Sequence, residues 1–335
     1  FAPIIEALQA DTPDVRWLMT DGQGGDSEFE QAISTAAIVP DMMALDAADQ
    51  AMLMYSSGTT GQPKGVVLTH GNMLAAVINE TISFEADRNS VSYAVMPLFH
   101  IGAMMGFSVP VMFLGGTAVI AREFEPGAML EAITSPEYGV THVLGLPAVY
   151  NALAMHPAYE SSDFSRIVIA AGGAEPMPEP LLRSWFDHGV PIVEVYGMTE
   201  TCGLACCLLR EDIPDKIGSA GKASMFIDIK IMKSDNEEAA CGEQGEIWMR
   251  GSNVTPGYWR RPDANETAFA DGWLRSGDIG RKDEEGFIYI DDRIKDMYIS
   301  GGENVYPAEV ENVLYMIPQI SEVAVVGVPD EKWGE

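Results

Sequence analysis

A stretch rich in hydroxyl groups and glycines, YSSGTTGQPKGV, runs from Tyr55 to Val66. Backbone N–H groups in a glycine-rich turn can converge on phosphate oxygens, and serine and threonine hydroxyls supply further donors. Lys64 adds a positive charge. The stretch differs from a P-loop, because Lys64 is followed by Gly65 rather than by serine or threonine. Loop chemistry alone leaves two interpretations open, a phosphate-binding loop and an ordinary surface turn.

This loop follows the first of several short apolar runs that are typical of buried strands. Helical stretches, for example His70–Glu80 and Glu179–His188, lie between these runs. Alternating strands and helices predict an α/β fold, with a mostly parallel sheet covered on both faces. The expected strands are Ala51–Ser57, Gly116–Ala121, Thr141–Leu146, Arg166–Gly173 and Pro191–Gly197.

Three of these strands lead into loops of small or polar residues. The loops are Ser56–Lys64, Gly172–Pro176 and Gly197–Thr201. In parallel sheets, ligands bind beyond the carboxyl ends of the strands. We therefore expect the three loops to converge at one rim of the sheet, around a ligand.

The pattern changes near Asp215. Phe226–Met232, Gly245–Gly251 and Gly286–Asp292 are short strand-like runs separated by turn residues, which predicts a small antiparallel sheet or barrel. We expect residues 1–214 to be the α/β part of a large domain that is incomplete at its N-terminus, and residues 215–294 to be its β-rich subdomain.

A third segment begins near Lys295. We expect a glycine turn, a helix over Pro307–Ile317 with proline near its start, and a strand over Glu322–Pro329. One helix and one strand cannot bury a core by themselves. Residues 295–335 are therefore predicted to be a hinge and the start of an incomplete small α+β C-terminal domain.

The charge of the chain excludes some partners. Lys plus Arg number 20 and Asp plus Glu number 50, so the net charge is −30. This argues against unspecific binding to nucleic acid or to anionic lipid, although a local pocket can still bind a nucleotide. The start of the chain lacks the basic segment and long apolar core of a signal peptide.

One apolar stretch, Ala103–Ala121, is long enough to raise the question of a membrane span. Pro110 and the Gly115–Gly116 pair interrupt it, so a buried helix, a turn and a buried strand fit better. The four cysteines, Cys202, Cys206, Cys207 and Cys241, show neither a disulfide framework nor zinc spacing. We expect Cys202, Cys206 and Cys207 to be small buried hydrophobic residues rather than a metal site, in a protein of the reducing cytoplasm.

Four motifs occur in order along the chain: YSSGTTGQPKGV, VYGMTET (Val195–Thr201), GWLRSGDIG (Gly272–Gly280) and DRIKDMYISGGENVYPAEVE (Asp292–Glu311). Together they resemble the adenylate-forming, or AMP-binding, superfamily, most closely its bacterial fatty-acid–CoA ligases. The resemblance implies a two-step reaction. A carboxylate attacks the α-phosphorus of ATP to give an acyl-adenylate, and the thiol of coenzyme A then displaces AMP.

The resemblance assigns roles to the first two motifs. Tyr196 matches the residue that lies against adenine, Thr199 the hydroxyl donor to the α-phosphate, and Glu200 the carboxylate that holds Mg²⁺. Without the motif, Glu200 would be read as solvated surface. The pyrophosphate-binding loop corresponds to Ser57, Thr59, Thr60 and Lys64, and the segments around adenine to Gly197 and to Gly172, Gly173, Ala174, Glu175 and Pro176.

It assigns further roles to the later motifs. Asp278 matches the carboxylate that accepts both ribose hydroxyls, Arg293 a second ribose and phosphate contact, and Lys295 the hinge. Gly301 and Gly302 match a turn at the coenzyme A tunnel. His100 matches a position near the carboxylate and thioester site. Ordinary turn or core roles are the alternatives at each of these positions.

The class of carboxylic acid substrate is predicted from the residues that are expected to surround it. Amino-acid-activating relatives carry an aspartate near His100, and here no carboxylate lies between Val91 and Ile120. We expect a fatty or otherwise hydrophobic acid, with the chain length and the pathway left open. The expected pocket residues are Phe99, Ile101, Met104, Leu144, Leu146, Met198 and Leu204.

The alternatives are an adenylating enzyme that loads a carrier-protein thiol and a non-catalytic adenylate-binding module. The lysine that this family uses for adenylation is expected beyond Glu335. The other partners are small molecules, with no nucleic acid and no transmembrane span, and the oligomeric state is open.

Overall fold

The computed structural model describes residues 2–18, 20, 27–37, 43–56, 63–234, 237–300, 303–317, 319–320, 323–330 and 333–335. The chain divides into two compact units, Phe1–Leu45 and Asp46–Glu335. The first unit contains two helices, α1 (Ala2–Asp11) and α2 (Glu28–Thr35). Ser27 caps α2, because its side chain accepts a hydrogen bond from the Glu30 N–H. All further elements belong to the second unit.

A seven-stranded sheet is the largest element of the second unit. Its strand order is β4-β3-β5-β6-β7-β8-β9. The pairs from β4 to β7 are parallel, and β8 and β9 are added antiparallel. The strands are β3 (Val91–Ala94), β4 (Thr117–Ile120), β5 (His142–Gly145), β6 (Ile169–Gly173), β7 (Ile192–Met198), β8 (Gly203–Cys207) and β9 (Lys222–Ala223). The predicted α/β class is confirmed.

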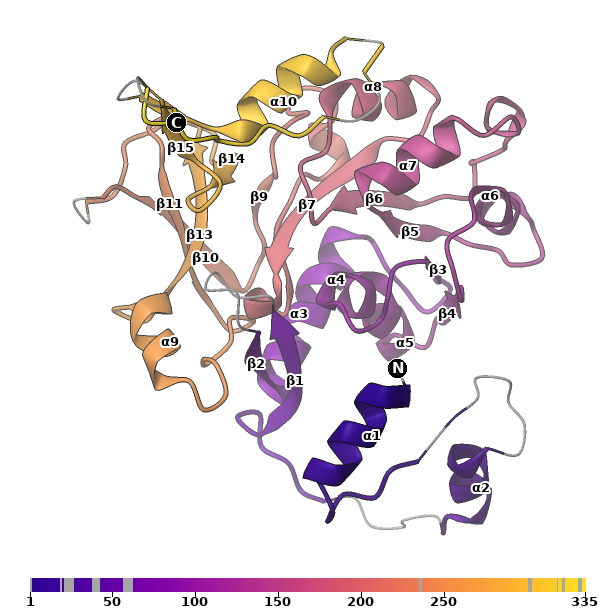
Figure 1. The fold of residues 1–335 in the computed structure, drawn as a ribbon. Coiled ribbons are helices and arrows are strands. Elements are labelled where there is room, and N and C mark those ends of the chain that lie inside the picture. The colour runs from indigo at the N-terminus through magenta and orange to yellow at the C-terminus, as the bar shows by residue number, and fades with distance from the viewer. Residues whose placement is uncertain are drawn as a thin grey trace. The chain divides into compact units, whose positions relative to one another are not determined.

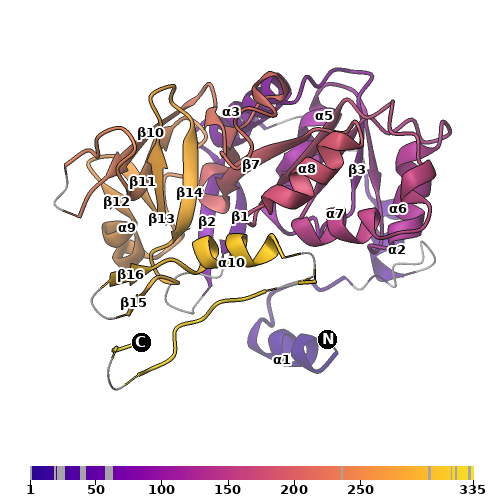
Figure 2. The same ribbon diagram turned by 90° about the horizontal axis from the view of Figure 1, so that it is seen from above.

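Helices cover both faces of this sheet (Figures 1 and 2). On one face lie α6 (Pro126–Thr134), α7 (Pro147–Ala154) and α8 (Glu179–Asp187). Their buried residues pack on Ala170 and Ile192. On the other face, Phe84, Phe107 and Val111 pack on strand residues that include Ile169, Ala171 and Val193. Successive strand residues thus face opposite cores, which explains the nearly continuous apolar runs.

The second face is covered by α3 (His70–Ser83) and by α4 (Ile101–Ala103), the π-helical turn Met104–Ser108 and α5 (Val109–Phe113). The apolar stretch 103–121 forms short helices and a turn, as expected. The strand expected to be buried is wrong in one respect, because β4 is the edge strand of the sheet and its residues are exposed or intermediate. Among the helices in the described ranges, none is long and apolar enough to cross a membrane.

One expected strand pairs differently. The sequence places Ala51–Ser57 in the parallel sheet, but β1 (Gln50–Ser56) pairs antiparallel with β2 (Lys64–Thr69) in a two-stranded sheet of its own. The two strands nevertheless contribute to a hydrophobic core, because Met54, Val66 and Leu68 pack against α3 and Met105. An apolar run shows that a strand is buried, but not which strand it pairs with.

A second sheet is antiparallel, with strand order β10-β11-β13-β12 and β14 beside β13. It confirms the predicted β-rich region. Its elements are β10 (Ile227–Met232), β11 (Gly245–Gly251), α9 (Pro262–Ala268), β12 (Phe269–Ala270), β13 (Trp273–Lys282) and β14 (Ile288–Arg293). The sequence did not predict β13, whose Gly277 has a positive φ of 77° inside the strand.

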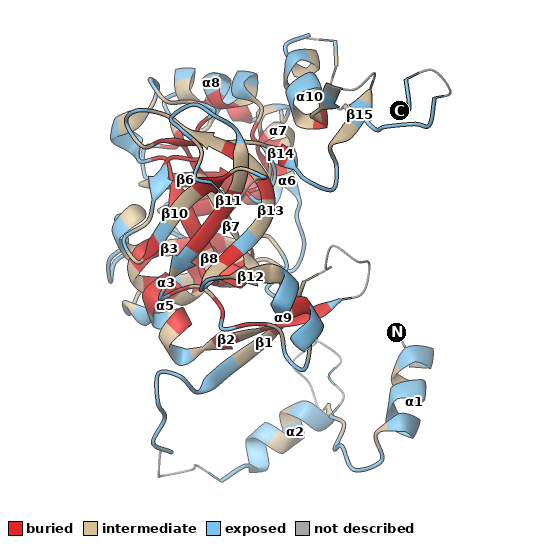
Figure 3. Ribbon diagram, turned by 90° about the vertical axis from the view of Figure 1, so that its left-hand side faces the viewer, coloured by how far each residue is buried: buried red, intermediate tan, exposed pale blue. Residues whose placement is uncertain are grey.

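The last segment contains β15 (Tyr298–Ser300), β16 (Glu303–Val305) and α10 (Pro307–Tyr315). The expected strand Glu322–Pro329 is wrong, because residues 323–329 form no strand and Asp330 makes only an isolated bridge with Gly334. Among the described residues, no strand pairs with residues 323–329, and a run of apolar residues needs a partner strand to form a β-ladder. Figure 3 shows buried residues concentrated on the two large sheets, with α10 mostly exposed or intermediate.

Asn72 ties α3 to the loop that follows β11. Its Nδ2 donates to the carbonyl oxygens of Ser252 and Val254, both at 2.9 Å, and its Oδ1 accepts from the Thr69 N–H at 3.0 Å. Thr69 accepts in return from the Asn72 N–H, which completes a capping box.

We expect Asn72→Ala to lower the free energy of unfolding by about 2–4 kcal/mol, because three hydrogen bonds are lost and two carbonyl groups lose their donor. Thermal unfolding of the variant and of Leu74→Ala, on the exposed side of the same helix, measures the effect. Equal midpoints for the two variants would contradict this role.

Candidate active site

A cleft of about 1860 Å³ lies between the seven-stranded sheet and the five-stranded antiparallel sheet. Its wall includes the carboxyl ends of β6 and β7, residues of β13 and β14, and the start of α10. The volume exceeds what one drug-sized ligand needs. The cleft therefore has room for a nucleotide-sized ligand and a second group beside it.

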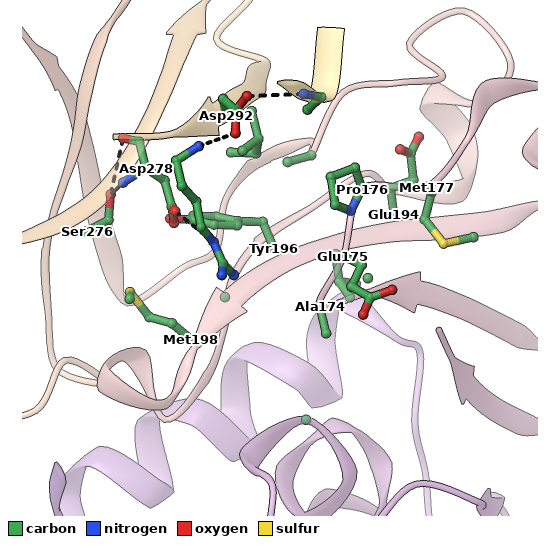
Figure 4. A pocket seen from close by; sticks show the side chains of 18 of the residues that line it. Ala174, Glu175, Pro176, Met177, Glu194, Tyr196, Met198, Ser276, Asp278 and Asp292 are labelled. Carbon is green, nitrogen blue, oxygen red and sulfur yellow. Dashed lines mark hydrogen bonds and ion pairs between the residues drawn. The ribbon is translucent and has the colours of Figure 1, made fainter. Parts of the chain in front are cut away.

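A tyrosine and an aspartate meet across this cleft. The Tyr196 hydroxyl, at the end of β7, donates to Asp278 Oδ2 of β13 at 2.6 Å. Their side chains point toward each other in Figure 4. Arg293 is opposite Asp278 in the β13–β14 ladder, and its Nε lies 3.6 Å from Asp278 Oδ1. The resulting group presents an aromatic ring, a carboxylate and a guanidinium to one space.

Burial dominates the ionisation of this group. It raises the pKa of Asp278, while the Tyr196 hydrogen bond and the charges of Arg293 and Lys295 oppose the rise. The pKa of Tyr196 is raised, first by burial and then by the Asp278 charge. Tyr196 is thus held as the neutral donor and Asp278 as the acceptor.

Small residues bring the end of β6 against Tyr196's strand. A Cβ on Gly173 would lie 2.3 Å from the Val195 carbonyl oxygen, so no larger residue fits there without a shift. The following Ala174, Glu175 and Pro176 line the same cleft (Figure 4). Gly197 is equally constrained, because its Cβ would lie 1.8 Å from the Gly203 carbonyl oxygen.

Glu200 is the centre of a second polar group. It is buried, and its Oε1 accepts from the Tyr258 hydroxyl at 2.9 Å and from Ser56 Oγ at 3.3 Å. The Lys64 ammonium lies 5.1 Å from the centre of the Tyr258 ring. Glu200 and Lys64 thus both neighbour Tyr258 on the wall of the cleft.

Most of the predicted site residues reach this cleft. Ser57, Thr59, Thr60, Gly301 and Gly302 lie outside the described residues. Those that line the cleft are His100, Ile101, Leu144, Leu146, Met198, Thr199, Leu204, Lys64, Gly172, Gly173, Ala174, Glu175, Pro176, Tyr196, Gly197, Glu200, Asp278, Arg293 and Lys295.

Phe99 and Met104 do not line the cleft. The Phe99 side chain is 73% exposed and its ring lies against that of His100, with 4.6 Å between ring centres. Met104 packs instead against the core formed by β1, β2 and α3. The turn before α4 and the π-helical turn after it set these two orientations, which residue spacing cannot show.

Three residues that contribute to the site were not assigned to it from the sequence. Ser56 is the first residue of the predicted loop Ser56–Lys64 but was given no role of its own, whereas Tyr258 belongs to no motif and gives no signal before folding. Glu194 could have been noticed, because it interrupts the apolar run PIVEVYG with a carboxylate. Glu194 accepts a hydrogen bond from the Gly218 N–H at 2.9 Å and lines the cleft. Burial raises its pKa to about 8.

The side chains of the cleft also indicate how a metal ion could be bound. Within the described parts of the chain, no three His, Cys, Asp or Glu side chains are grouped to hold an ion by themselves. Glu200 instead offers a single buried carboxylate on the wall of the cleft. Mg²⁺ is commonly bound through one or two carboxylates together with phosphate oxygens of a substrate, so this site fits magnesium only in combination with a phosphate ligand.

Two family models match the sequence. The model described as AMP-binding enzyme matches residues 3–259, and that described as AMP-binding enzyme C-terminal domain matches residues 309–335. Among curated relatives, a feruloyl-CoA synthase of an Amycolatopsis species is 42% identical over 86% of this chain and 58% of its own. A long-chain-fatty-acid–CoA ligase of Mycobacterium tuberculosis is 38% identical over 100% of this chain and 65% of its own.

Solved structures agree in fold. The o-succinylbenzoate CoA synthetase of Bacillus subtilis, in complex with its acyl-adenylate intermediate, superposes with a TM-score of 0.82 at 36% identity. That match covers 91% of this chain and 62% of the synthetase. The same enzyme in complex with ATP and magnesium ion gives 0.81 at 34% identity, over 91% and 63%. The chain spans about three fifths of the length of these proteins.

The raised pKa of Glu194 predicts a pH-dependent stability. Between about pH 4.5 and pH 8 the unfolded chain has released this proton and the folded chain has kept it. The free energy of unfolding therefore falls as the pH rises through this window, by up to about 1.4 kcal/mol per pH unit from this group. Glu194→Gln retains the acceptor for Gly218 without titrating.

We expect the thermal midpoint of Glu194→Gln, relative to the wild type, to rise between pH 5 and pH 8. Glu266→Gln, at an exposed position, controls for general loss of a charge. A constant difference between the Glu194 variant and the wild type over this range would refute the assignment.

Proposed function

The chain belongs to the AMP-binding enzyme family, and from this premise we propose that the complete protein is an ATP-dependent acyl-CoA ligase. In the first step a carboxylate attacks the α-phosphorus of ATP, which yields an acyl-adenylate and pyrophosphate. In the second step the thiolate of coenzyme A attacks the acyl carbonyl and AMP leaves. The observation that carries the proposal is the group formed by Tyr196, Asp278 and Arg293 within the cleft.

This group suits an AMP unit. The Tyr196 ring offers a flat surface for adenine, next to a strand end that admits only small residues. Asp278 offers carboxylate oxygens to two neighbouring ribose hydroxyls, and Arg293 offers guanidinium donors to ribose or phosphate.

The second polar group suits the phosphates. Thr199 lies directly before Glu200 on the same wall, and its hydroxyl can donate to the α-phosphate. Lys64, together with Ser57, Thr59 and Thr60, would bind pyrophosphate. Glu200 would hold Mg²⁺, oriented by Tyr258 and Ser56. When bound, the ion neutralises phosphate charge and stabilises the transferring phosphorus centre.

The other end of the cleft suits the acid. Ile101, Leu144, Leu146 and Leu204 form an apolar wall, with His100 at its edge. Burial of a hydrocarbon tail there contributes about 0.8 kcal/mol per methylene. The relatives' names include feruloyl, long-chain-fatty-acid and 2-succinylbenzoate ligases. We assign a hydrophobic carboxylic acid to this chain, with fatty acids as the first class to test.

The C-terminal segment joins the same cleft. The Ala308 N–H, at the start of α10, donates to Asp292 Oδ2 of β14 at 3.1 Å (Figure 4). Lys295 is the proposed hinge for the movement between the two steps, and Gly301 and Gly302 would approach coenzyme A. Cys202, Cys206 and Cys207 are buried free thiols, in keeping with a cytoplasmic setting as the proposed compartment.

The direct test measures AMP formation by the complete protein with ATP, Mg²⁺, coenzyme A and a panel of acids that includes octanoate, palmitate and ferulate. We expect turnover that requires both an acid and coenzyme A. Turnover without dependence on coenzyme A, or none with any acid class, would overturn the ligase proposal. A carrier-protein thiol in place of coenzyme A tests the other acceptor.

Glu200→Gln keeps the shape of the side chain and removes its charge. We expect kcat/KM for ATP to fall by about 100-fold or more at saturating acid, with an unchanged thermal midpoint, because the group that would hold the ion is lost. Glu211→Gln, at an exposed site, should behave as the wild type. Loss of folding together with activity would instead indicate a structural glutamate.

A further inference from the structure

A buried carboxyl without a partner lies at the apolar end of the cleft. Glu80, in the last turns of α3, is 1% exposed and is one of the residues that line the cleft. Neither of its carboxyl oxygens has a hydrogen-bond partner in the part of the chain that the structure describes. Buried polar groups normally have a partner, so this glutamate calls for an explanation.

The groups around Glu80 are apolar. A Cβ on Gly203 would lie 2.7 Å from Glu80 Oε1, and the Met105 side chain flanks the same point. Phe84 follows Glu80 by one helical turn, and Leu204 follows Gly203 on β8; both line the cleft beside the glutamate. No ion pair to Glu80 occurs among the described residues. Nothing in this surrounding compensates a negative charge.

These apolar surroundings favour the neutral form of Glu80. Burial raises the pKa of its carboxyl well above the ordinary value, and the backbone N–H of Leu204 offsets this only in part, without reaching normal hydrogen-bond geometry. A protonated carboxyl presents one O–H donor and one carbonyl acceptor. Among the described residues neither the donor nor the acceptor has a partner in normal hydrogen-bond geometry, which disfavours the folded state unless a ligand supplies the partners.

A hydroxyl group matches this requirement. It can accept from the Glu80 O–H and donate to the Glu80 carbonyl oxygen, and it brings no charge into the apolar wall. An ammonium or a second carboxylate would have to be desolvated there as an ion. An unsubstituted alkyl tail would leave both the O–H donor and the carbonyl acceptor of Glu80 unpaired.

Resting on the proposed ligase function, we infer that Glu80 selects the acyl substrate, and that the preferred acid carries a hydroxyl group on its tail that pairs with this carboxyl. Glu80 is thus the one polar determinant that we assign to an otherwise apolar pocket. Sites built to pair with a substrate hydroxyl reject the analogue that lacks it more strongly than apolar pockets reject an added methylene.

The experiment compares matched acids on the complete protein, with ATP and Mg²⁺. The pairs are 4-hydroxycinnamate with cinnamate and 16-hydroxypalmitate with palmitate. Acid-dependent pyrophosphate release gives kcat/KM for each acid. We expect the wild type to favour the hydroxylated acid of at least one pair by about 10-fold or more.

Three variants test the role of the side chain. Glu80→Leu should bring the ratio close to one, through a lower kcat/KM for the hydroxylated acid. Glu80→Gln should keep most of the preference, because the amide also both donates and accepts. Glu85→Gln removes a nearby exposed carboxylate and should leave the ratio unchanged.

The thermal midpoint of unfolding separates the proposed role of Glu80 from a structural role, because the two roles predict opposite changes. Removal of an unpaired buried carboxyl should raise the thermal midpoint of Glu80→Leu, whereas loss of a structural partner would lower it. If Glu80→Leu fails to fold, the role is structural and the inference is wrong.

The remaining outcomes separate the two proposals. Equal kcat/KM within every pair, in an enzyme that adenylates the acids, overturns the inference and leaves the ligase intact. A preference that survives Glu80→Leu places the determinant elsewhere and overturns it as well. The absence of pyrophosphate release with all acids, even with coenzyme A present, would overturn the ligase proposal itself.

Discussion

The contact on which the cleft depends is the hydrogen bond from Tyr196 to Asp278. It joins β7 of the seven-stranded sheet to β13 of the antiparallel sheet, and it spans 82 positions of the chain. Because both groups are largely buried, neither can exchange the other for water without cost. The bond sets how an aromatic face and a carboxylate approach each other, and thereby the shape of one end of the cleft.

Close backbone approach supports this geometry. Gly173 and Gly197 lie so near the neighbouring strands that a Cβ would meet a carbonyl oxygen. Asn72 and Asn253 donate to backbone carbonyl groups of the loop after β11 and of the segment before β8. The Thr255 hydroxyl donates to the Val67 carbonyl of β2 and accepts from the Gly257 N–H. Buried side chains that bond to backbone are specific, since each has few alternative partners.

The cleft is polar at one end and apolar at the other. Asp278 and Arg293 form an ion pair, Glu200 accepts hydrogen bonds from two hydroxyl groups, and Lys64 lies over the Tyr258 ring, within a chain of net charge −30. The apolar end contains Glu80, which has no such partner among the described residues. Glu200 and Glu80 are both buried, so the difference between them lies in their partners: two hydroxyl groups donate to Glu200, and no described group donates to Glu80 in hydrogen-bond geometry.

The sequence by itself determined the α/β class, the antiparallel region and the motifs around Tyr196 and Asp278, because periodicity and turn chemistry act between residues close in the chain. It did not determine the hairpin of β1 with β2, the absence of a strand at residues 323–329, or the outward orientation of Phe99. Only the tertiary structure brought Ser56 and Tyr258 to Glu200 and left Glu80 without a partner. Such contacts join distant segments through packing, and no local pattern records them.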